Sequence, residues 1–399
     1  MSTAIETSIR RRDLVFGIAF ITRLLLFQFS EVTDILASRV EVVTPITSFT
    51  RLTEGLYLFQ NGVPPYDGGV FHQAPLLLAF FQPLSYLPDQ FTSLIYILID
   101  LLLAYLLSQI SRIKQQLYKD LPRVDDIELI DDNKNEEEES SWVVAGLYLF
   151  NPFTIATCLS KSTITFTNLS IALGTFYSLK GNKIHGCFWI AMATYLSFYP
   201  LMLIIPITML LVNSGKIMSR TPPQQESFSS SSSKSITISK KIEIAQCIIL
   251  YIGWLAVLLL LSFILVESWD FLEATYGVIL LLPDLTPNIG GIMAVFKSYP
   301  SIGDASFYLG FLPIYSEIVK YMRYNFFTTN IFLYSSLLAP IFYHLWIYAG
   351  SGNANFFYAI TLVYSVGNII LLVDATFAML RREFDVWNPK LRYCEVTQR

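Results

Sequence analysis

Charged side chains inside apolar segments are the first residues in this sequence that could carry chemistry. Arg23, Asp100 and Asp374 each interrupt a long apolar run. A charge in hydrocarbon is costly unless it is paired or faces a polar cavity. We predict that Arg23 and Asp100 are partners across neighbouring helices. The alternative is that they line a polar cavity that receives a lipid headgroup.

Polar strings bounded by proline and glycine are the second group of candidates. Two of them are Pro283–Gly290 and Ala349–Asn355, and a tight turn follows the break at Asn151-Pro152. Asparagine offers a donor and an acceptor to sugar hydroxyls, and lysine offers a point charge to phosphate. The alternative is that these side chains cap helices and shape turns. The candidates for headgroup binding are Lys161, Asp284, Asn288, Asn353 and Asn355.

Catalytic chemistry finds little support in the residue types. A thiol hydrolase needs a cysteine and a histidine within hydrogen-bond reach. Only His72 and His344 fall on the side of the membrane that the charge pattern makes luminal, and neither has a cysteine near it in sequence. No His, Cys and carboxylate cluster has metal-ligand spacing. We therefore predict no catalytic residue, no metal and no cofactor. Glu31, Asp34 and Glu41 would suit the base or metal ligand of a lipid-linked glycosyltransferase, so that alternative stays open.

The elements that must position these residues are transmembrane helices. The chain has 399 residues, of which 53% are hydrophobic and 15% charged, and its mean hydropathy is +0.50. A soluble domain carries roughly 25% charged residues. Stretches such as Ile244–Val266 and Phe356–Leu380 are long enough to cross about 30 Å of hydrocarbon, where the backbone must be helical. Acidic residues between Asp125 and Glu139 contribute much of the net charge of −4, and nothing indicates a nucleic-acid partner.

The positions of Lys and Arg predict the orientation, because short cytoplasmic loops are enriched in them. Arg10–Arg12 place the N-terminus in the cytoplasm. Ten crossings put every basic cluster on one side and both termini in the cytoplasm. We therefore expect an all-α, multi-pass transmembrane bundle of about ten spans. The expected spans are Leu14–Ser30, Phe91–Ser111, Trp142–Leu159, Thr163–Lys180, Ile184–Phe198, Tyr199–Asn213, Ile244–Val266, Ser306–Tyr321, Phe326–Ala349 and Phe356–Leu380.

The remaining segments read as loops of a single polytopic domain. Residues 31–90 form a luminal loop in which Phe71–Leu87 lies at the interface as a helix, since prolines would break a spanning ladder. Residues 267–303 are a second luminal region. Residues 112–141, acidic, and 214–241, serine-rich, are expected to be cytoplasmic linkers that cannot bury enough apolar surface to fold.

Several irregular strings resemble one known family, the PIG-U subunit of the GPI transamidase. They occur in family order through nearly the whole chain. The main matching strings are RVEVVTP at residues 39–45, NPFTIATCLSKST at 151–163, PDLTPNIG at 283–290, FKSYPSIGD at 296–304 and HLWIYAGSGNANFFYAITL at 344–362.

The resemblance implies a fold, a function and partners. The family is similar to the multi-pass GPI mannosyltransferases, which implies the GT-C glycosyltransferase membrane fold. It implies a non-catalytic subunit in the endoplasmic reticulum membrane that binds and presents the GPI glycolipid. Other transamidase subunits, including a thiol-protease-like catalytic one, would be its partners. The alternative is a dolichol-phosphate-dependent mannosyltransferase of GPI biosynthesis. Such transferases carry an acidic pair after their equivalent of Val40–Val43, where this sequence has Thr44-Pro45, which argues against transfer.

The sequence departs from the family pattern at one place. Two further spans normally separate the PDLTPNIG and FKSYPSIGD strings, whereas here Gly291 is followed almost directly by Phe296. Loss of a pair of spans preserves the orientation of everything that follows.

Overall fold

The computed structural model describes residues 2–119, 134–218, 232–277 and 301–388, and these residues form helices and turns with no strand among them. They divide into two compact units. The first unit takes in the described residues up to Ile314, and the second takes in those from Tyr315 onward. The expected all-helical architecture is therefore confirmed for the described part of the chain.

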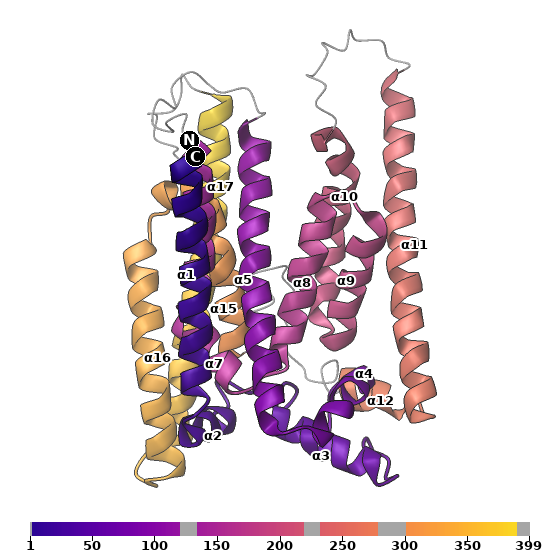
Figure 1. Cartoon of the computed structure of the whole chain (residues 1–399), viewed down its shortest axis with the longest axis vertical. Helices are drawn as coiled ribbons and strands as arrows, with labels where there is room; N and C mark the ends of the chain where they lie inside the picture. The colour runs from indigo at the N-terminus through magenta and orange to yellow at the C-terminus, as the bar shows by residue number, and fades with distance from the viewer. Residues whose placement is uncertain (1, 120–133, 219–231, 278–300, 389–399) are drawn as a thin grey trace. The chain divides into compact units, whose positions relative to one another are not determined.

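The first unit is built on long helices that run back and forth along one direction (Figure 1). α9 packs against α8 and α11, and α5 packs against α6 and α8. The helices are α1 (Ser2–Leu26), α5 (Asp89–Lys119), α6 (Lys134–Leu149), α7 (Pro152–Leu159), α8 (Ile164–Leu179), α9 (Lys183–Leu196), α10 (Ile204–Met218), α11 (Ser232–Val266) and α15 (Ile302–Phe311).

Length and composition make four of the described helices long and apolar enough to cross a membrane, or up to six if each of two bent pairs counts as one span. The bent pairs are α1 with α2 (Ser30–Ser38), at 88°, and α6 with α7, at 56°. α8, α9 and α10 have 16, 14 and 15 residues. At 1.5 Å per residue each is about 21–24 Å long, shorter than a typical 30 Å hydrocarbon core. Each of the ten expected spans contains helix, but these three do not reach spanning length. The expected span Ser306–Tyr321 does not either, because α15 has 10 residues and is followed by a kinked 3₁₀ segment, Leu312–Tyr321.

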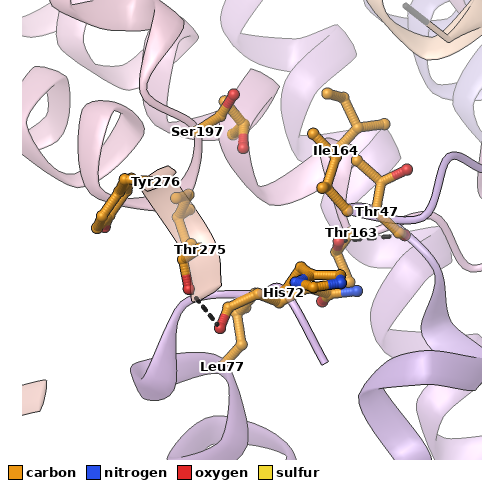
Figure 2. Close-up of a pocket in the computed structure, with 12 residues that line it drawn as sticks. Thr47, His72, Leu77, Thr163, Ile164, Ser197, Thr275 and Tyr276 are labelled. Atoms are coloured by element: carbon orange, nitrogen blue, oxygen red, sulfur yellow. Dashed lines mark hydrogen bonds between the residues drawn. The ribbon is translucent and has the colours of Figure 1, made fainter. Parts of the chain in front are cut away.

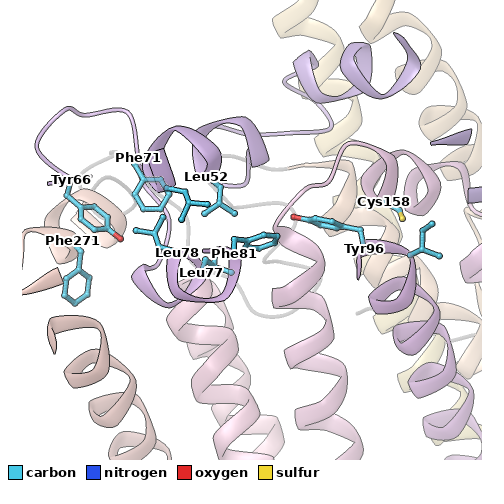
Figure 3. Close-up of a cluster of buried hydrophobic side chains, with 11 residues drawn as sticks. Leu52, Tyr66, Phe71, Leu77, Leu78, Phe81, Tyr96, Cys158 and Phe271 are labelled. Atoms are coloured by element: carbon cyan, nitrogen blue, oxygen red, sulfur yellow. The ribbon is translucent and has the colours of Figure 1, made fainter. Parts of the chain in front are cut away.

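Short helices gather at one end of the first unit, the lower end in Figure 1, which we call the loop end. They are α2, α3 (Phe49–Gln60), α4 (Pro75–Phe81), a 3₁₀ turn (Pro83–Tyr86), α12 (Asp270–Leu272) and a π turn (Glu273–Gly277). Apart from α2, they are held together by a cluster of buried rings and aliphatic side chains, with Phe71 and Phe81 near its middle (Figure 3). The expected helix over Phe71–Leu87 is thus two short ones, each beginning at a proline, whose fixed φ suits a first helical position.

The helices continue past the apolar segments into the expected linkers. α5 reaches Lys119, α6 begins at Lys134, α10 reaches Met218 and α11 begins at Ser232. Once the apolar part of a helix has formed, each added residue gains a hydrogen bond without a new nucleation cost. The linkers are therefore shorter than the composition predicts, and their centres lie outside the described residues.

The second unit is a helical hairpin. α16 (Asn325–Ile347) and α17 (Ala354–Trp387) pack against each other, with Gly367 of α17 so close to Ile331 that a Cβ would lie 2.7 Å from that side chain. Many of their large apolar side chains are exposed, including Phe326 and Val373. Such surfaces suit a lipid environment.

Candidate functional site

The buried charges of the first unit form one ion pair. Arg23 and Asp100 are both fully buried, with the Arg23 Nη2 2.6 Å and the Nε 2.8 Å from Asp100 Oδ2. The hydroxyl of Tyr148 donates to Asp100 Oδ1 at 2.8 Å. The predicted pairing is confirmed, and each carboxylate oxygen has a donor, which is the condition under which a buried pair is tolerated.

Arg23 also repairs the helix break at Asn151-Pro152. Pro152 has no N–H to donate to the Tyr148 carbonyl, which instead accepts from the Thr154 hydroxyl at 2.6 Å. The Phe153 N–H donates to the Asn151 side chain at 2.9 Å instead of the Leu149 carbonyl. That carbonyl accepts from Arg23 Nη2 at 2.9 Å. A proline break is tolerated in a membrane helix when neighbouring groups supply such replacements.

Lys161 follows α7 in a left-handed backbone conformation, with φ of 53°. Its Nζ lies 2.7 Å from both carboxylate oxygens of Asp89, at the start of α5, and 5.5 Å from the ring centre of Phe49. The Lys161 side chain is 13% exposed and that of Asp89 is 76% exposed. The turn thus holds a shielded ammonium beside a solvent-facing carboxylate, and a phosphate would have to displace that carboxylate to reach it.

Asn353 and Asn355 lie at the start of α17 in the second unit. The Asn353 side-chain oxygen accepts the Asn355 backbone N–H at 3.1 Å, so Asn353 caps the helix. The preceding turn is tight, because a Cβ on Gly352 would lie 3.0 Å from the Leu345 carbonyl carbon. Both asparagines are exposed. The cap uses only the backbone of Asn355, which leaves its amide side chain outside the capping interaction.

Asp284 and Asn288 lie outside the described residues, so the structure says nothing of their surroundings. Asp374 is placed, within the second unit, and it is buried. Its carboxylate accepts the backbone N–H groups of Arg323 and Tyr324, both at 2.9 Å, just before α16 begins. This side chain therefore satisfies donors at a helix N-terminus, which otherwise have no intrahelical partner.

Three of the irregular strings quoted above, at residues 39–45, 151–163 and 296–304, have described residues that meet at the loop end of the first unit. The Ile302 N–H donates to the Glu41 carbonyl at 2.9 Å, and the Thr163 N–H donates to the Thr47 carbonyl at 2.9 Å. Gly303 allows this convergence, because a Cβ there would lie 2.7 Å from the Ile164 side chain. Segments from residues 39–48, 151–168 and 301–304 are thus joined by direct hydrogen bonds.

The carboxyl group of Glu41, in the first loop, is partly buried, and this changes its pKa. Burial raises the pKa of its carboxyl, and the backbone hydrogen bond and the charge of Arg39 only partly offset that effect. One carboxylate oxygen is buried without a hydrogen-bond partner among the described residues. Burial thus makes the charged carboxylate of Glu41 less favourable than that of a solvent-exposed glutamate.

A small pocket lies at the loop end, between the first loop, α8, α9 and the π turn (Figure 2). The pocket has a water-accessible volume of about 20 Å³, and part of its wall is open to the surface. It is lined by Ile46, Thr47, His72, Gln73, Leu77, Thr163, Ile164, Thr167, Leu196, Ser197, Thr275 and Tyr276.

The described residues offer few groups for covalent or metal chemistry. Cys158, Cys187 and Cys247 are buried and unbridged. Within the described ranges, no group of three or more His, Cys, Asp or Glu side chains could hold a metal ion.

Sequence reasoning missed several residues of these sites. The sequence did not single out Asp89, Tyr148 and Gln73, because each is an ordinary polar residue near a helix end. One signal was available for the helix break: Pro152 stands four residues after Tyr148, so the Tyr148 carbonyl must find another donor.

The fold and these sites define a class of protein. Several helices have the length and apolar composition to cross a bilayer, buried charges are paired inside the bundle, and irregular polar loops gather at one end. This is the architecture of a polytopic helical membrane protein.

Comparison with known proteins identifies the family. The family model described as "GPI transamidase subunit PIG-U" matches residues 17–291 and 289–364. The human GPI-anchor transamidase component PIGU is 34% identical over 427 residues, covering 93% of this chain and 94% of the human protein. The GPI transamidase component GAB1 of Saccharomyces cerevisiae is 32% identical, covering 90% and 91%. The chain belongs to the PIG-U family.

Two details of these matches bear on the sequence analysis. The two matched ranges meet at residues 289–291, where the chain departs from the family pattern. GPI mannosyltransferase 1 of Dictyostelium discoideum is 22% identical over 213 residues, covering 53% of this chain and 43% of that protein. The likeness to mannosyltransferases is therefore present but weaker and partial.

Proposed function

We propose that this protein is a subunit of a GPI transamidase and takes part in attaching GPI anchors to proteins at the endoplasmic reticulum membrane. Family membership over nearly the whole chain carries this proposal. In this proposal the chain crosses the membrane ten times in a GT-C-like arrangement, with both termini cytoplasmic and the loop end luminal. The short helices α8, α9 and α10, and α15 with the segment up to Tyr321, then span a locally thinned part of the bilayer.

The subunit's part in the reaction is to hold the GPI lipid and present its headgroup, while a thiol-protease-like subunit performs the chemistry. The three thiols in the described part of the chain are buried, which supports a non-catalytic role for them, because a thiol nucleophile must be reachable and activated. Exposed apolar helix faces suit acyl chains.

Asn353, Asn355 and Lys161 are the described candidates for headgroup contacts in this proposal, with Asp284 and Asn288 proposed from the sequence. Asn355 is the sharper candidate of the two at the start of α17, because its side-chain amide is outside the helix cap. Lys161 would exchange the exposed Asp89 carboxylate for a phosphate oxygen, since both are anionic acceptors of the same kind.

Yeast cells depleted of GAB1 provide the test of function. Expression of this chain should restore GPI attachment to a reporter protein. The chain itself should co-purify with the remaining transamidase subunits. Failure to co-purify, when the chain is present in the membrane at normal levels, contradicts the proposal.

Substitutions at the start of α17 test the headgroup site. Asn353→Ser keeps a capping oxygen and removes the amide, whereas Asn353→Ala removes both. With Asn355→Ala, these variants separate capping from binding when assembly and photo-crosslinking to a GPI analogue are measured side by side. Normal assembly with weaker crosslinking in Asn353→Ser and Asn355→Ala supports headgroup contact. Unchanged crosslinking in both Asn353→Ser and Asn355→Ala would contradict headgroup contact by these side chains.

The alternative function is a mannosyltransferase of GPI biosynthesis, favoured only by the partial likeness to GPI mannosyltransferase 1. Membranes that contain this protein, supplied with labelled dolichol-phosphate-mannose and GPI precursor, should show no mannose transfer above membranes that lack it.

A further inference from the structure

Two polar side chains of α16 have hydrogen-bonding groups that the described part of the chain leaves without a partner. Tyr334 is 59% exposed, and its hydroxyl makes no hydrogen bond to any described residue. The Asn330 amide N–H₂ donates to the Phe326 carbonyl of its own helix at 2.7 Å. The Asn330 oxygen, Oδ1, has no donor among the described residues. This helix therefore presents a hydroxyl and an amide oxygen that are both available.

Both groups lie within the hydrocarbon when α16 crosses the bilayer, as in the arrangement proposed above. The midpoint of the apolar span Asn325–Ile347 is residue 336. At 1.5 Å per residue, Tyr334 is about 3 Å and Asn330 about 9 Å from that midpoint along the helix. The hydrocarbon extends roughly 15 Å to each side of the bilayer centre and offers no hydrogen-bond partner. Lipid alone is therefore an unfavourable neighbour for this face.

α11 provides the contrast. Most of this helix is exposed as well, but its exposed side chains between Ile248 and Ile264 are all aliphatic. The hydroxyls of Tyr251 and Ser262 in the same stretch are buried and bonded to side chains of α9. The exposed face of α11 thus suits acyl chains, whereas the face of α16 requires a neighbour that can form hydrogen bonds.

The spacing and chemistry of the α16 face suit a second helix as that neighbour. Phe326, Asn330, Leu333 and Leu337 follow one another at intervals of four and three residues, which lines them up along a helix that crosses at about 20°. The backbone of a membrane helix is already paired, so its hydroxyl or amide side chains have to meet Asn330 and Tyr334. The human and yeast relatives are named components of a transamidase, so other subunits are the expected source of such a helix.

We propose that the face of α16 formed by Asn330, Tyr334 and Leu337 binds a transmembrane helix of another transamidase subunit. Leu337 makes the apolar contact, and hydroxyl or amide side chains of the partner helix pair with Asn330 and Tyr334. This inference rests on the proposed function, because that function supplies the partner. It adds the place of contact and the chemistry that recognises it.

Photo-crosslinking from two matched positions tests this face in yeast cells that are depleted of GAB1 and express the full chain. A benzophenone-bearing phenylalanine replaces Leu337 on α16 or, as the control, Ile252 on α11. These residues are 58% and 57% exposed, and each lies one position from the midpoint of its apolar span. Position 337 should crosslink to a transmembrane segment of another transamidase subunit, mapped by mass spectrometry, whereas position 252 should give lipid adducts. Lipid adducts only from position 337, or a crosslink to a second copy or within the chain, would overturn the proposal.

Substitutions beside the probe test the polar contacts. Tyr334→Phe and Asn330→Leu should each lower the yield of the subunit crosslink from position 337 about threefold, as expected for loss of one hydrogen bond between membrane helices. Tyr358→Phe is the control, because Tyr358 is 62% exposed near the start of α17, where water can reach its hydroxyl. The level of each variant in the membrane is the check on folding.

The outcomes separate this contact from the function of the chain. Unchanged crosslink yield in both α16 variants would overturn the proposed contact. If such a chain still restores GPI attachment and co-purifies with the other subunits, its function as a subunit stands and only the docking face is wrong. If the unsubstituted chain fails to co-purify with them, the proposed function and this contact are both wrong.

Discussion

The ion pair of Arg23 and Asp100 predicts a specific order of stabilities. Asp100→Leu strands the Arg23 charge and removes the acceptor of the Tyr148 hydroxyl. Removing one partner of a buried pair costs about 3–5 kcal/mol, and an orphaned buried hydroxyl about 1–3 kcal/mol more. The single substitution should therefore cost about 4–8 kcal/mol, comparable with the whole stability of many domains.

Removing the charges together should be less harmful than removing one. Arg23→Met with Asp100→Leu leaves the Tyr148 hydroxyl and the Leu149 carbonyl without partners, at a cost of roughly 2–6 kcal/mol. Adding Tyr148→Phe leaves only the carbonyl, at about 1–3 kcal/mol. Because the ranges for the single and double variants overlap, the comparison of single with triple is the decisive one.

Fluorescence-detected size-exclusion after a temperature series measures this order on the full chain in mild detergent. Leu98→Ala is the matched control on α5, because Leu98 is 51% exposed and lies away from the network. The triple variant should melt well above Asp100→Leu and below the wild type. Equal midpoints for Asp100→Leu and the triple variant would refute the reasoning that a stranded charge dominates the cost.

Three further predictions concern a close glycine contact, a buried acid and the two cytoplasmic linkers. Gly303→Val should disrupt the packing of α15 against α7 and α8, whereas Gly253→Ala should be tolerated because Gly253 has open space around it. The two variants are compared by their level in the membrane and their stability in detergent. Equal loss in both would contradict the packing argument. Because burial raises the pKa of Glu41, the folded state should lose stability as pH rises from the normal glutamate range through the folded-state pKa. Glu41→Gln should therefore be more stable than the wild type at pH 7, and its melting temperature should depend less on pH. A loss of stability in Glu41→Gln at pH 7 would contradict this prediction. Deleting residues 122–131 and 221–230, which spares the described helix ends, should preserve membrane level and assembly; loss of assembly would show that one segment binds a partner.

The sequence predicted the helical class and the positions of most helices because apolar length is a strong signal in a membrane protein. The Arg23–Asp100 pair was predictable for the same reason, since two opposite charges in neighbouring apolar segments have few other partners. The bends were less predictable. Pro152 marked the break between α6 and α7, but the 88° turn between α1 and α2 has no proline or glycine at it.

The candidate site was less predictable than the fold because it depends on contacts between distant segments. Lys161 read as a free cation in the sequence, and its partner Asp89 lies 72 positions away. Asn353 read as a binding residue, and the structure also gives it a helix cap, which the pattern of Asn before an apolar run equally predicts. The pocket around Gln73 could not be inferred at all, since its walls come from five separate stretches of chain.

The composition of GPI intermediates in cells that lack this protein tests the central claim most directly. If the chain is a transamidase subunit, complete GPI precursors with a full glycan should accumulate, proteins should retain their C-terminal attachment signals, and re-expression should reverse both effects. Accumulation of truncated glycans that lack mannose, with no excess of complete precursor, would contradict the account and assign the chain to GPI synthesis instead.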